Sequence, residues 1–285
     1  MSVNEPKIEI IDKQATTAVV RTSFSSDKIN VDWHTHPEFE ILYIIEGFGS
    51  RIIGDSVSSF GEGMLMLIGS NVPHLIKSDA KSIKNKQLIF QFSEKLIAKD
   101  ILYFEEFKSI STLIYNSYYG IDFPIEFSKS LLNKLINLTN IKSEKVVSNL
   151  FEILEDLSLC DNYTTVTTLP YKTDNTENTR IGKVYNYVLN NYMQEITVDK
   201  AAKLLNLSKP AFCNYFKKKV NKRFTEFVNE IRINKACILL KETDKNISEI
   251  SYEVGFVNIS YFNRYFLKLK NITPLKYRIN KSMSL

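Results

Sequence analysis

The order of hydrophobic and polar residues changes its period along this chain. Up to about residue 95 the pattern is that of short β-strands. The clearest alternation places Phe39, Ile41, Tyr43 and Ile45 between Glu40, Leu42, Ile44 and Glu46. Further strands are expected at residues 64–68 and 88–92, and turns at Gly47, Gly49, Gly54-Asp55 and Gly61-Glu62-Gly63. Many short strands separated by turns favour a small β-barrel or sandwich.

Residues 95–160 have the period of amphipathic helices. Two hydrophobic stripes are expected, namely Leu131, Leu135 and Leu138, and, after an N-cap at Ser143, Val147, Leu150, Leu154 and Leu157. The second stripe has a spacing of roughly 3.5 residues, which suits two interpretations. The helix pairs with its twin in a second subunit, or it lies on the barrel of its own chain.

Residues 161–179, DNYTTVTTLPYKTDNTENT, are polar and rich in Thr, Asn and Asp. Such a composition is typical of a linker. We therefore expect one domain over residues 1–160, a linker over 161–179 and a second domain over 180–285.

The second domain is helical throughout by its pattern. Ile181, Val184, Val188 and Tyr192 open it with an amphipathic helix. Thr197 is expected to cap a helix over 198–205, before a turn at Asn206-Leu207. Ser208 then caps a helix that runs to about Val220, with Pro210 tolerated in its first turn, where the amide has no intrahelical partner.

A second copy of this arrangement follows a long helix over residues 225–240. Asn246 or Ser248 starts a short helix that ends near Val254, and Gly255 makes the turn. Asn258 caps a final helix, Ile259–Lys270, which Thr273-Pro274 is expected to close. A short helix, a tight turn and a second helix with an exposed polar start is the helix-turn-helix plan, here at about 197–220 and 247–271.

Charge is distributed unevenly between the two expected domains. Residues 180–285 hold 20 Lys/Arg and 8 Asp/Glu, a net +12, whereas the whole chain has a net charge of +5. A basic module joined to an acidic one indicates that the C-terminal part meets a polyanion, either nucleic acid or an anionic membrane. An ordinary helical bundle with a solvated basic face would not explain the duplicated turns, so we predict double-stranded DNA as the partner.

The remaining composition excludes several other classes of protein. No hydrophobic run reaches the roughly 18 residues of a membrane span, and the start MSVNEPKIEIIDKQ lacks the basic and apolar segments of a signal peptide. We therefore expect a cytoplasmic protein without a membrane partner. Cys160, Cys213 and Cys237 form no CxxC pair and are expected to be reduced thiols.

The segment from Thr197 to Arg278 resembles the AraC/XylS-type transcription regulators. The second helix-turn-helix carries the most specific part of the resemblance, in Ile247, Ile250, Gly255-Phe256, Tyr261-Phe262, Arg264, Phe266, Pro274, Tyr277 and Arg278. Two positions depart from the family pattern. Ser251 stands where Ala is usual, and Asn221 stands where Gly usually ends the first recognition helix.

The resemblance implies which residues face DNA. The candidates for base contacts are Lys209, Pro210, Cys213, Asn214 and Lys217 in the first recognition helix, and Asn258, Ser260, Tyr261, Asn263, Arg264 and Lys268 in the second. Asn214 suits an adenine edge, Arg264 suits guanine O6/N7 or a phosphate, and Cys213 suits a thymine methyl. Phosphate contacts are expected from Lys218, Lys219, Lys222 and Arg223, while Ala211, Phe212 and Phe216 are expected to face the core.

All three histidines of the chain lie in the strand-rich domain. His34, His36 and Glu40 share strand parity, although Pro37 is expected to bend the strand, and His74 follows Pro73. The pattern is similar to the two motifs of the cupin barrel, with Ile68-Gly69-Ser70 in place of the usual Pro-x-Gly. It implies a site where His34, His36, Glu40 and His74 hold a divalent metal, or a metal-free pocket that hydrogen-bonds a small polar effector. Trp33, Tyr43, Arg51 and Phe90 are further candidates to line it, with Trp33 either stacking on a sugar-like ring or belonging to the core.

The fold class predicted from these features is α+β with two domains, a cupin-like β-barrel with flanking helices and an all-α double helix-turn-helix. The leading functional prediction is a sequence-specific, non-enzymatic transcription regulator, an activator acting with RNA polymerase. The resemblance implies a homodimer whose barrel binds a small-molecule effector such as a sugar. Two alternatives stay open at this point: a metal-dependent cupin enzyme, such as a dioxygenase or isomerase, and an architectural DNA binder without an effector.

Overall fold

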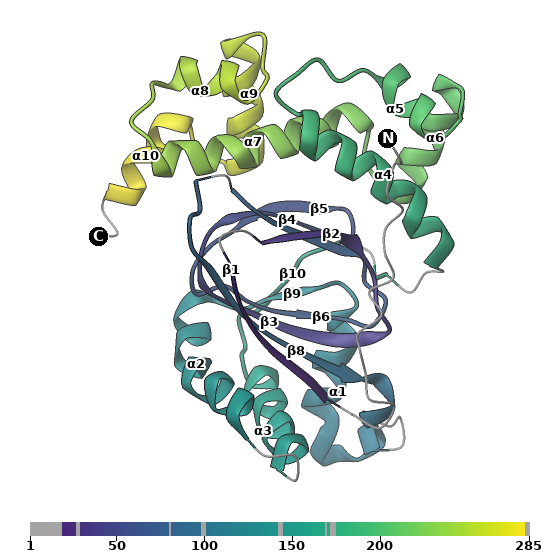
Figure 1. Ribbon diagram of the computed structural model, residues 1–285, viewed down its shortest axis with the longest axis vertical. Helices are drawn as coiled ribbons and strands as arrows, with labels where there is room; N and C mark the ends of the chain where they lie inside the picture. Colours follow the sequence, from purple (N-terminus) through teal and green to yellow (C-terminus); the bar gives the residue numbers. More distant parts are fainter. Residues whose placement is uncertain are drawn as a thin grey trace. The chain divides into compact units, whose positions relative to one another are not determined.

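A computed structural model describes residues 19–26, 29–79, 81–97, 101–141, 145–168, 170–171 and 175–282. The described chain divides into two compact units. One contains the strands that precede Ser50 together with Phe60–Asn178, and the other contains Ser50–Ser59 and Thr179–Leu285. The architecture confirms the α+β prediction, with a strand-rich N-terminal part and a helical C-terminal part (Figure 1).

The strands form two antiparallel sheets, whose orders are β1-β8-β3-β6-β9-β10 and β2-β7-β4-β5. Their bounds are β1 Val19–Ser26, β2 Asn30–His34, β3 Glu38–Glu46, β4 Gly49–Ile53, β5 Ser56–Phe60, β6 Leu65–Ile68, β7 His74–Ser78, β8 Asn85–Ser93, β9 Ile121–Asp122 and β10 Thr164–Thr165. The strands expected at 39–46, 64–68 and 88–92 are thus confirmed as β3, β6 and β8.

Both faces of β3 are buried, which explains its long hydrophobic run. Phe39, Ile41 and Tyr43 belong to the main hydrophobic core, whereas Glu40 and Leu42 are buried on the opposite face. A strand covered on both sides needs few polar residues. The buried carboxylate of Glu40 therefore needs polar partners.

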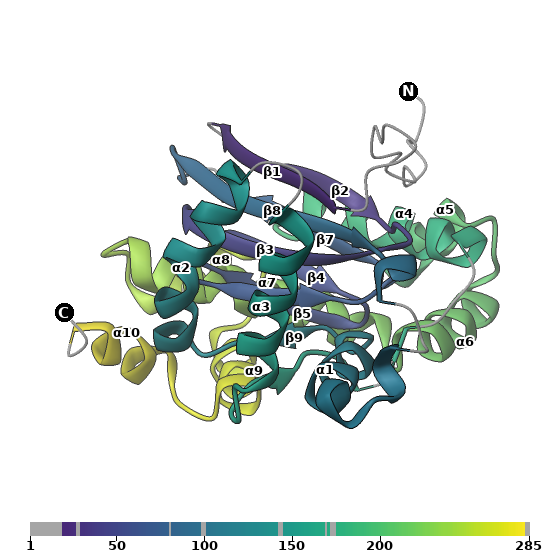
Figure 2. The same ribbon diagram turned by 90° about the horizontal axis from the view of Figure 1, so that it is seen from below.

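Three α-helices cover the Phe39 face of this sheet (Figures 1 and 2). They are α1 Lys108–Ser117, α2 Ile125–Asn140 and α3 Val146–Ser158, preceded by the 3-10 helices η1 Glu94–Leu96, η2 Ile101–Tyr103 and η3 Glu105–Phe107. The predicted α2 stripe of Leu131, Leu135 and Leu138 is buried in the core shared with β3 and β8.

The α3 stripe resolves the choice between its two interpretations. Leu150, Leu154 and Leu157 are buried in the same core, so α3 lies on the barrel of its own chain. Val147 is 36% exposed and falls outside the stripe. The N-cap of α3 is Lys145, and the expected cap Ser143 lies outside the described residues. These leucines are therefore not available to pair with a twin helix.

The segment interpreted as a linker contains regular structure at both of its ends. Thr164 and Thr165 form β10 against β9, and Val166 N donates to Gly120 O over 2.9 Å. Helix α4, Asn175–Asn191, begins before the expected start of the opening helix. Polar composition predicted a chain without secondary structure here, but threonine also suits a short edge strand.

The helical part consists of α4 and six further helices. They are α5 Val198–Leu204, α6 Lys209–Val220, α7 Phe224–Glu242, α8 Ile247–Glu253, α9 Ile259–Lys270 and α10 Pro274–Ser282. Thr273-Pro274 does more than close α9, because Pro274 is the first residue of α10 and Thr273 Oγ1 accepts from the amide of Lys276. Proline is favoured there since the first amides of a helix lack intrahelical partners.

The two ends of α7 support the two helix-turn-helix units (Figure 1). Near its N-terminus, the ring of Phe224 packs edge-on against Phe212 and Phe216 of α6, with ring centroids 5.2 and 5.3 Å apart. In its C-terminal half, Ile233 and Leu240 are buried in one cluster with residues of α8 and α9. Within the described ranges, no helix has the length and hydrophobicity needed to cross a bilayer.

Candidate DNA interface and histidine site

Local capping chemistry builds the first helix-turn-helix as expected. Thr197 Oγ1 accepts from the amide of Lys200 to start α5, and Ser208 Oγ accepts from the amide of Ala211 to start α6. Asn206, with φ of 53°, adopts the left-handed conformation that the turn between them requires. Asn221 ends α6 in the same conformation, so the departure from Gly at that position is tolerated.

The N-terminal half of α6 leaves its predicted DNA-facing residues exposed. All five candidates, Lys209, Pro210, Cys213, Asn214 and Lys217, are exposed, whereas Phe212 and Phe216 are buried. The expectation that Ala211 faces the core is wrong, because Ala211 is exposed. Lys209 Nζ lies 3.1 Å from Asp199 Oδ2, an exposed pair of little energetic weight.

The second unit is built by the same chemistry with stronger caps. Asn246 and Glu249 form a capping box in which each side chain accepts from the other's amide, both over 2.9 Å. Asn258 caps α9 by accepting from the amide of Tyr261, and Asn271 ends it with φ of 57°. Gly255 makes the turn with φ of 92°.

Helix α9 presents a polar face at the positions predicted for base contacts. Asn258, Ser260, Asn263, Arg264 and Lys268 are exposed, and Tyr261 is 39% exposed. The opposite face is hydrophobic, since Phe262 and Phe266 are fully buried.

The predicted phosphate contacts differ in how available they are. Lys218 and Arg223 are exposed and Lys219 is half-buried. Lys222 Nζ lies 2.8 Å from Glu230 Oε2 on α7, and both side chains are largely buried. Burial raises the pKa of Glu230 above its usual value, and the charge of Lys222 offsets this only in part. Lys222 thus serves an ion pair inside the helical unit, a role that the sequence did not indicate.

Strand pairing brings the three histidines and Glu40 together, although the chain breaks between them. β2 ends at His34 and β3 begins at Glu38, so Pro37 interrupts the strand as expected. His34 pairs with His74 across β2 and β7, and Glu40 pairs with Gln91 across β3 and β8. Candidate ligand nitrogens of the three buried imidazoles all lie within 4.8 Å of one another.

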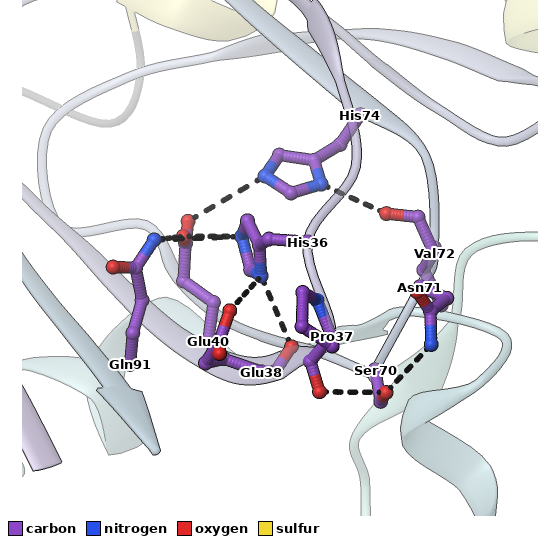
Figure 3. A network of polar contacts seen from close by, with 9 residues as sticks. All are labelled: His36, Pro37, Glu38, Glu40, Ser70, Asn71, Val72, His74 and Gln91. Carbon is purple, nitrogen blue, oxygen red and sulfur yellow. Dashed lines mark hydrogen bonds and ion pairs between the residues drawn. The ribbon is translucent and has the colours of Figure 1, made fainter. Parts of the chain in front are cut away.

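Backbone contacts fix the break between β2 and β3. Ser70 Oγ donates to Pro37 O over 2.8 Å (Figure 3), and the backbone amide of Asn71 donates to His36 O over 2.9 Å. Gly69 is required beside them, because a Cβ there would lie 2.8 Å from the backbone of Ser117. The segment Gly69-Ser70-Asn71 thus holds the chain between β2 and β3 in place.

The hydrogen bonds of two imidazoles set their tautomers. Nδ1 of His36 lies 3.1 Å from Glu38 O, and Nδ1 of His74 lies 2.9 Å from Val72 O. Because a carbonyl only accepts, both Nδ1 atoms carry the proton, so Nε2 is an acceptor in a neutral ring, and His36 can donate from Nε2 to Glu40 only as an imidazolium. Both Nε2 atoms face the Glu40 carboxylate, at 3.1 Å for His36 and 3.8 Å for His74 (Figure 3).

The electrostatics leave this site rich in acceptors. Burial raises the pKa of Glu40, but the hydrogen bond with His36 and the neighbouring imidazoles lower it to about 2. Burial and the proximity of His34 hold the pKa of His74 well below its usual value. Glu40 is therefore an anion and His74 is neutral at pH 7. His74 Nε2 is buried and has no hydrogen-bond partner among the described residues.

Gln91 is a member of the site that the sequence reasoning missed. Its Nε2 donates to Glu40 Oε2 over 2.8 Å and lies 3.4 Å from His36 Nε2. The sequence feature that could have indicated Gln91 is its side-chain amide within the hydrophobic run Leu88–Ile89–Phe90–Gln91–Phe92. A polar residue in a buried strand needs a polar partner there.

The remaining pocket candidates divide into two groups. Tyr43 and Phe90 lie in the hydrophobic core under α1, α2 and α3, on the face of β3 and β8 opposite Glu40 and Gln91, so their assignment to the pocket is wrong. Alternation along each strand dictates this separation. Trp33 is buried in β2, and Arg51 of β4 donates from Nε to Ser58 Oγ over 2.7 Å. An effector contact from Trp33 or Arg51 stays a prediction.

The donor set fits a divalent transition metal. Three imidazoles and one carboxylate are ligands that zinc, iron, manganese or nickel accept. Two nitrogens bound to one tetrahedral ion at about 2.1 Å lie about 3.4 Å apart, so the farthest pair would close by at most about 1.4 Å. Backbone carbonyls behind His36 and His74 orient Nε2 in the way that metal ligands require.

Two family profiles match this chain, one in the strand-rich part and one in the helical part. The family profile described as "AraC-like ligand binding domain" matches residues 17–102, and that described as "Helix-turn-helix domain" matches residues 184–280. The chain is 27% identical over 253 residues to the HTH-type transcriptional regulator YdeC of Bacillus subtilis, covering 86% of this chain and 85% of YdeC. It is 29% identical over 161 residues to the transcriptional activator PerA of Escherichia coli O127:H6, covering 54% of this chain and 56% of PerA. The crystal structure of ToxT from Vibrio cholerae aligns over 92% of this chain and 98% of ToxT, at 15% identity and a TM-score of 0.37.

Proposed function

Because the chain is an AraC-type transcription regulator, with a DNA-binding helix-turn-helix domain and an AraC-like ligand-binding domain, we propose that α6 and α9 read successive major grooves of one duplex. The observation that carries this proposal is the mounting of two exposed polar helices on opposite ends of α7 (Figure 1). Major grooves on one face of DNA recur about every 34 Å and admit a helix. A rigid α7 suits two simultaneous contacts.

The side chains proposed to contact DNA fall into two groups, those that bind base edges and those that bind phosphates. Asn214 is proposed to pair with an adenine edge and Arg264 with guanine O6/N7, each by two hydrogen bonds. Lys218, Lys219 and Arg223 are proposed to contact phosphates, where flexible cations position the protein without reading sequence. Lys222 is the weakest candidate for a phosphate contact, because its ammonium group already pairs with Glu230.

A selection experiment tests this assignment. Duplexes that bind the full chain are enriched from a random library, and the affinity of each single-base-pair variant is then measured at fixed salt. Asn214→Ala should remove discrimination at one base pair, which is worth about 1–3 kcal/mol. Lys218→Ala should weaken all duplexes alike and reduce the salt dependence by about one phosphate contact.

Cys213 provides an independent check of the same face. Its thiol is exposed near the start of α6, so iodoacetamide should label it in the free protein. Selected duplex should protect Cys213 from labelling, whereas the same concentration of unrelated duplex at moderate salt should not. Equal labelling in all three conditions, or equal affinity for selected and random duplexes, would reject the proposal.

The barrel site supports a second proposal, that His34, His36, His74 and Glu40 hold a divalent transition-metal ion. A proton shared by His36 and Glu40 would satisfy only that pair and would leave His74 Nε2 without a partner. One metal ion accepts all these lone pairs at once and compensates the buried charge of Glu40. The metal would supply an anchoring point in the pocket, and the imidazoles would hold it there.

Metal binding is testable without DNA. In a Cys213→Ser background, which removes the exposed thiol, EDTA-treated full chain is exposed to Co²⁺ or Zn²⁺ and then gel-filtered. One ion per chain and visible Co²⁺ absorption bands are expected, with Mg²⁺ giving no binding. His74→Gln should abolish both signals, and no other histidine of the chain can replace it. Absence of bound Zn²⁺ and Co²⁺ from the Cys213→Ser protein would reject the site.

The finer parts of the regulatory role are proposals of the same kind. We propose that the barrel domain over 1–160 binds a small polar effector, that the chain acts as a homodimeric activator with RNA polymerase in the cytoplasm, and that it has no enzymatic activity. Similarity to transcription regulators, PerA among them, supports this interpretation. A thermal-shift screen against sugars and small acids tests the effector, because a ligand of the folded state raises its stability. Sedimentation and a promoter-reporter assay test the dimer and the direction of regulation.

A further inference from the structure

Tyr261 of α9 is held by a residue of α7 that no sequence motif indicated. Asn229 is buried, and its Nδ2 donates to Tyr261 Oη over 2.8 Å. The ring of Tyr261 also lies beside Phe256 and Tyr265, with ring centroids 5.9 and 5.8 Å away. A hydroxyl anchored from behind and a ring packed on two sides leave Tyr261 little rotational freedom.

Arg264 uses this fixed ring as a platform. Its guanidinium carbon lies 5.4 Å from the centroid of the Tyr261 ring, within the range of a cation–π contact. The two residues are three apart in α9, so they are neighbours on one helical face. Lys268 and Tyr265 repeat the arrangement at 5.6 Å, and Tyr265 Oη donates to Glu226 O of α7 over 3.4 Å.

An unsupported arginine on a helix surface reaches base edges and phosphates equally well. Its side chain has several rotamers, and ordering it on binding costs affinity. Bidentate contact with guanine needs the guanidinium plane held in one orientation, whereas a phosphate accepts many orientations. A platform that orders Arg264 before DNA arrives therefore favours base reading over phosphate contact.

We propose that Asn229 and Tyr261 are positioning residues that set the sequence specificity of Arg264. Asn229 orders Tyr261 through its hydroxyl, and Tyr261 orders Arg264 through its ring. Tyr261 then acts through Arg264 and makes no base contact of its own. This inference rests on the proposed contact of α9 with a major groove.

Tyr261→Phe tests the chain of contacts most cleanly, because it removes the hydroxyl that Asn229 anchors and leaves the ring volume unchanged. Tyr252→Phe is the matched control, since Tyr252 lies on α8 of the same helix-turn-helix and is 56% exposed. The probes are the duplex selected by the full chain and its single-base-pair variants. Circular dichroism confirms that each variant protein is folded.

Arg264→Ala should lose roughly 5- to 150-fold discrimination at one base pair. Tyr261→Phe should lose roughly 2- to 10-fold at that same base pair, with unchanged discrimination elsewhere and an unchanged salt dependence. Tyr252→Phe should change nothing. The double variant Tyr261→Phe/Arg264→Ala should be no worse than Arg264→Ala alone, since both changes remove one interaction.

Three results would overturn the inference. They are additive losses in the double variant, either no loss or an equal loss at every base pair for Tyr261→Phe, and unchanged specificity in Arg264→Ala. In each case the wild-type chain still prefers its selected duplex, so the proposed function survives. A wild-type chain without any sequence preference would instead reject the proposed function itself.

Discussion

Gly255, which joins α8 to α9, should be among the least replaceable residues of the helical unit. Its φ of 92° lies in a region that costs a residue with a Cβ about 1–2 kcal/mol. A Cβ built there would lie 2.4 Å from the carbonyl oxygen of Tyr192, so that carbonyl must move. The same oxygen accepts from Arg232 Nε over 2.9 Å, and losing a hydrogen bond to a charged group costs about 1.5–3 kcal/mol. Gly255→Ala should therefore destabilise the unit by about 2.5–5 kcal/mol.

Circular dichroism at 222 nm during thermal or urea unfolding measures this loss. For a unit of this size the melting temperature should fall by at least about 10 °C. Gly61→Ala is the control, because a Cβ added at Gly61 would meet no atom within 4 Å, and its effect should stay within about 0.5 kcal/mol. The emission of Trp33, the single tryptophan, should be unchanged before unfolding and shows that the strand-rich unit is intact. A loss below about 1 kcal/mol for Gly255→Ala would refute the reasoning from close approach and backbone conformation.

Three further predictions concern buried and exposed side chains. Leu154→Ala should lower the free energy of unfolding in urea by about 2–5 kcal/mol, because it empties a fully buried position. The control Leu159→Ala, at a residue 64% exposed, should lower it by less than about 0.5 kcal/mol. Similar losses for both variants would contradict the packing. Ser251→Ala should raise the free energy of unfolding by about 1 kcal/mol, since the buried Ser251 hydroxyl has no hydrogen-bond partner among the described residues. A lower free energy of unfolding would show that this hydroxyl does have a hydrogen-bond partner. Iodoacetamide at pH 8 should label one thiol per native chain, at exposed Cys213, because Cys160 and Cys237 are buried and burial raises the pKa of the Cys237 thiol. Labelling that survives Cys213→Ser would disprove this.

The elements of the helical unit were predictable because their signals are local. Thr197, Ser208, Asn246 and Asn258 cap helices through hydrogen bonds that span three residues, and Gly255 turns the chain through its own φ. Such interactions depend on neighbours in sequence, so spacing alone identified them. The sequence did not show that α7 anchors Tyr261 through Asn229, because that contact joins residues 32 positions apart.

The histidine site was less predictable from the sequence than the helical elements were. Strand parity grouped His34, His36 and Glu40, and the resemblance to the cupin motifs added His74 as a candidate for the same site. The assignment of Tyr43 and Phe90 to the pocket did not follow from parity, which puts Tyr43 on the face of β3 opposite Glu40.

The sequence by itself thus determined the local elements, the basic charge of the C-terminal part and the identity of the chemical groups. Only the tertiary structure decided which groups meet, because antiparallel pairing puts His34 opposite His74 and Glu40 opposite Gln91. Registers between strands far apart in the chain are set by the burial of whole faces, and no short stretch of sequence encodes that choice.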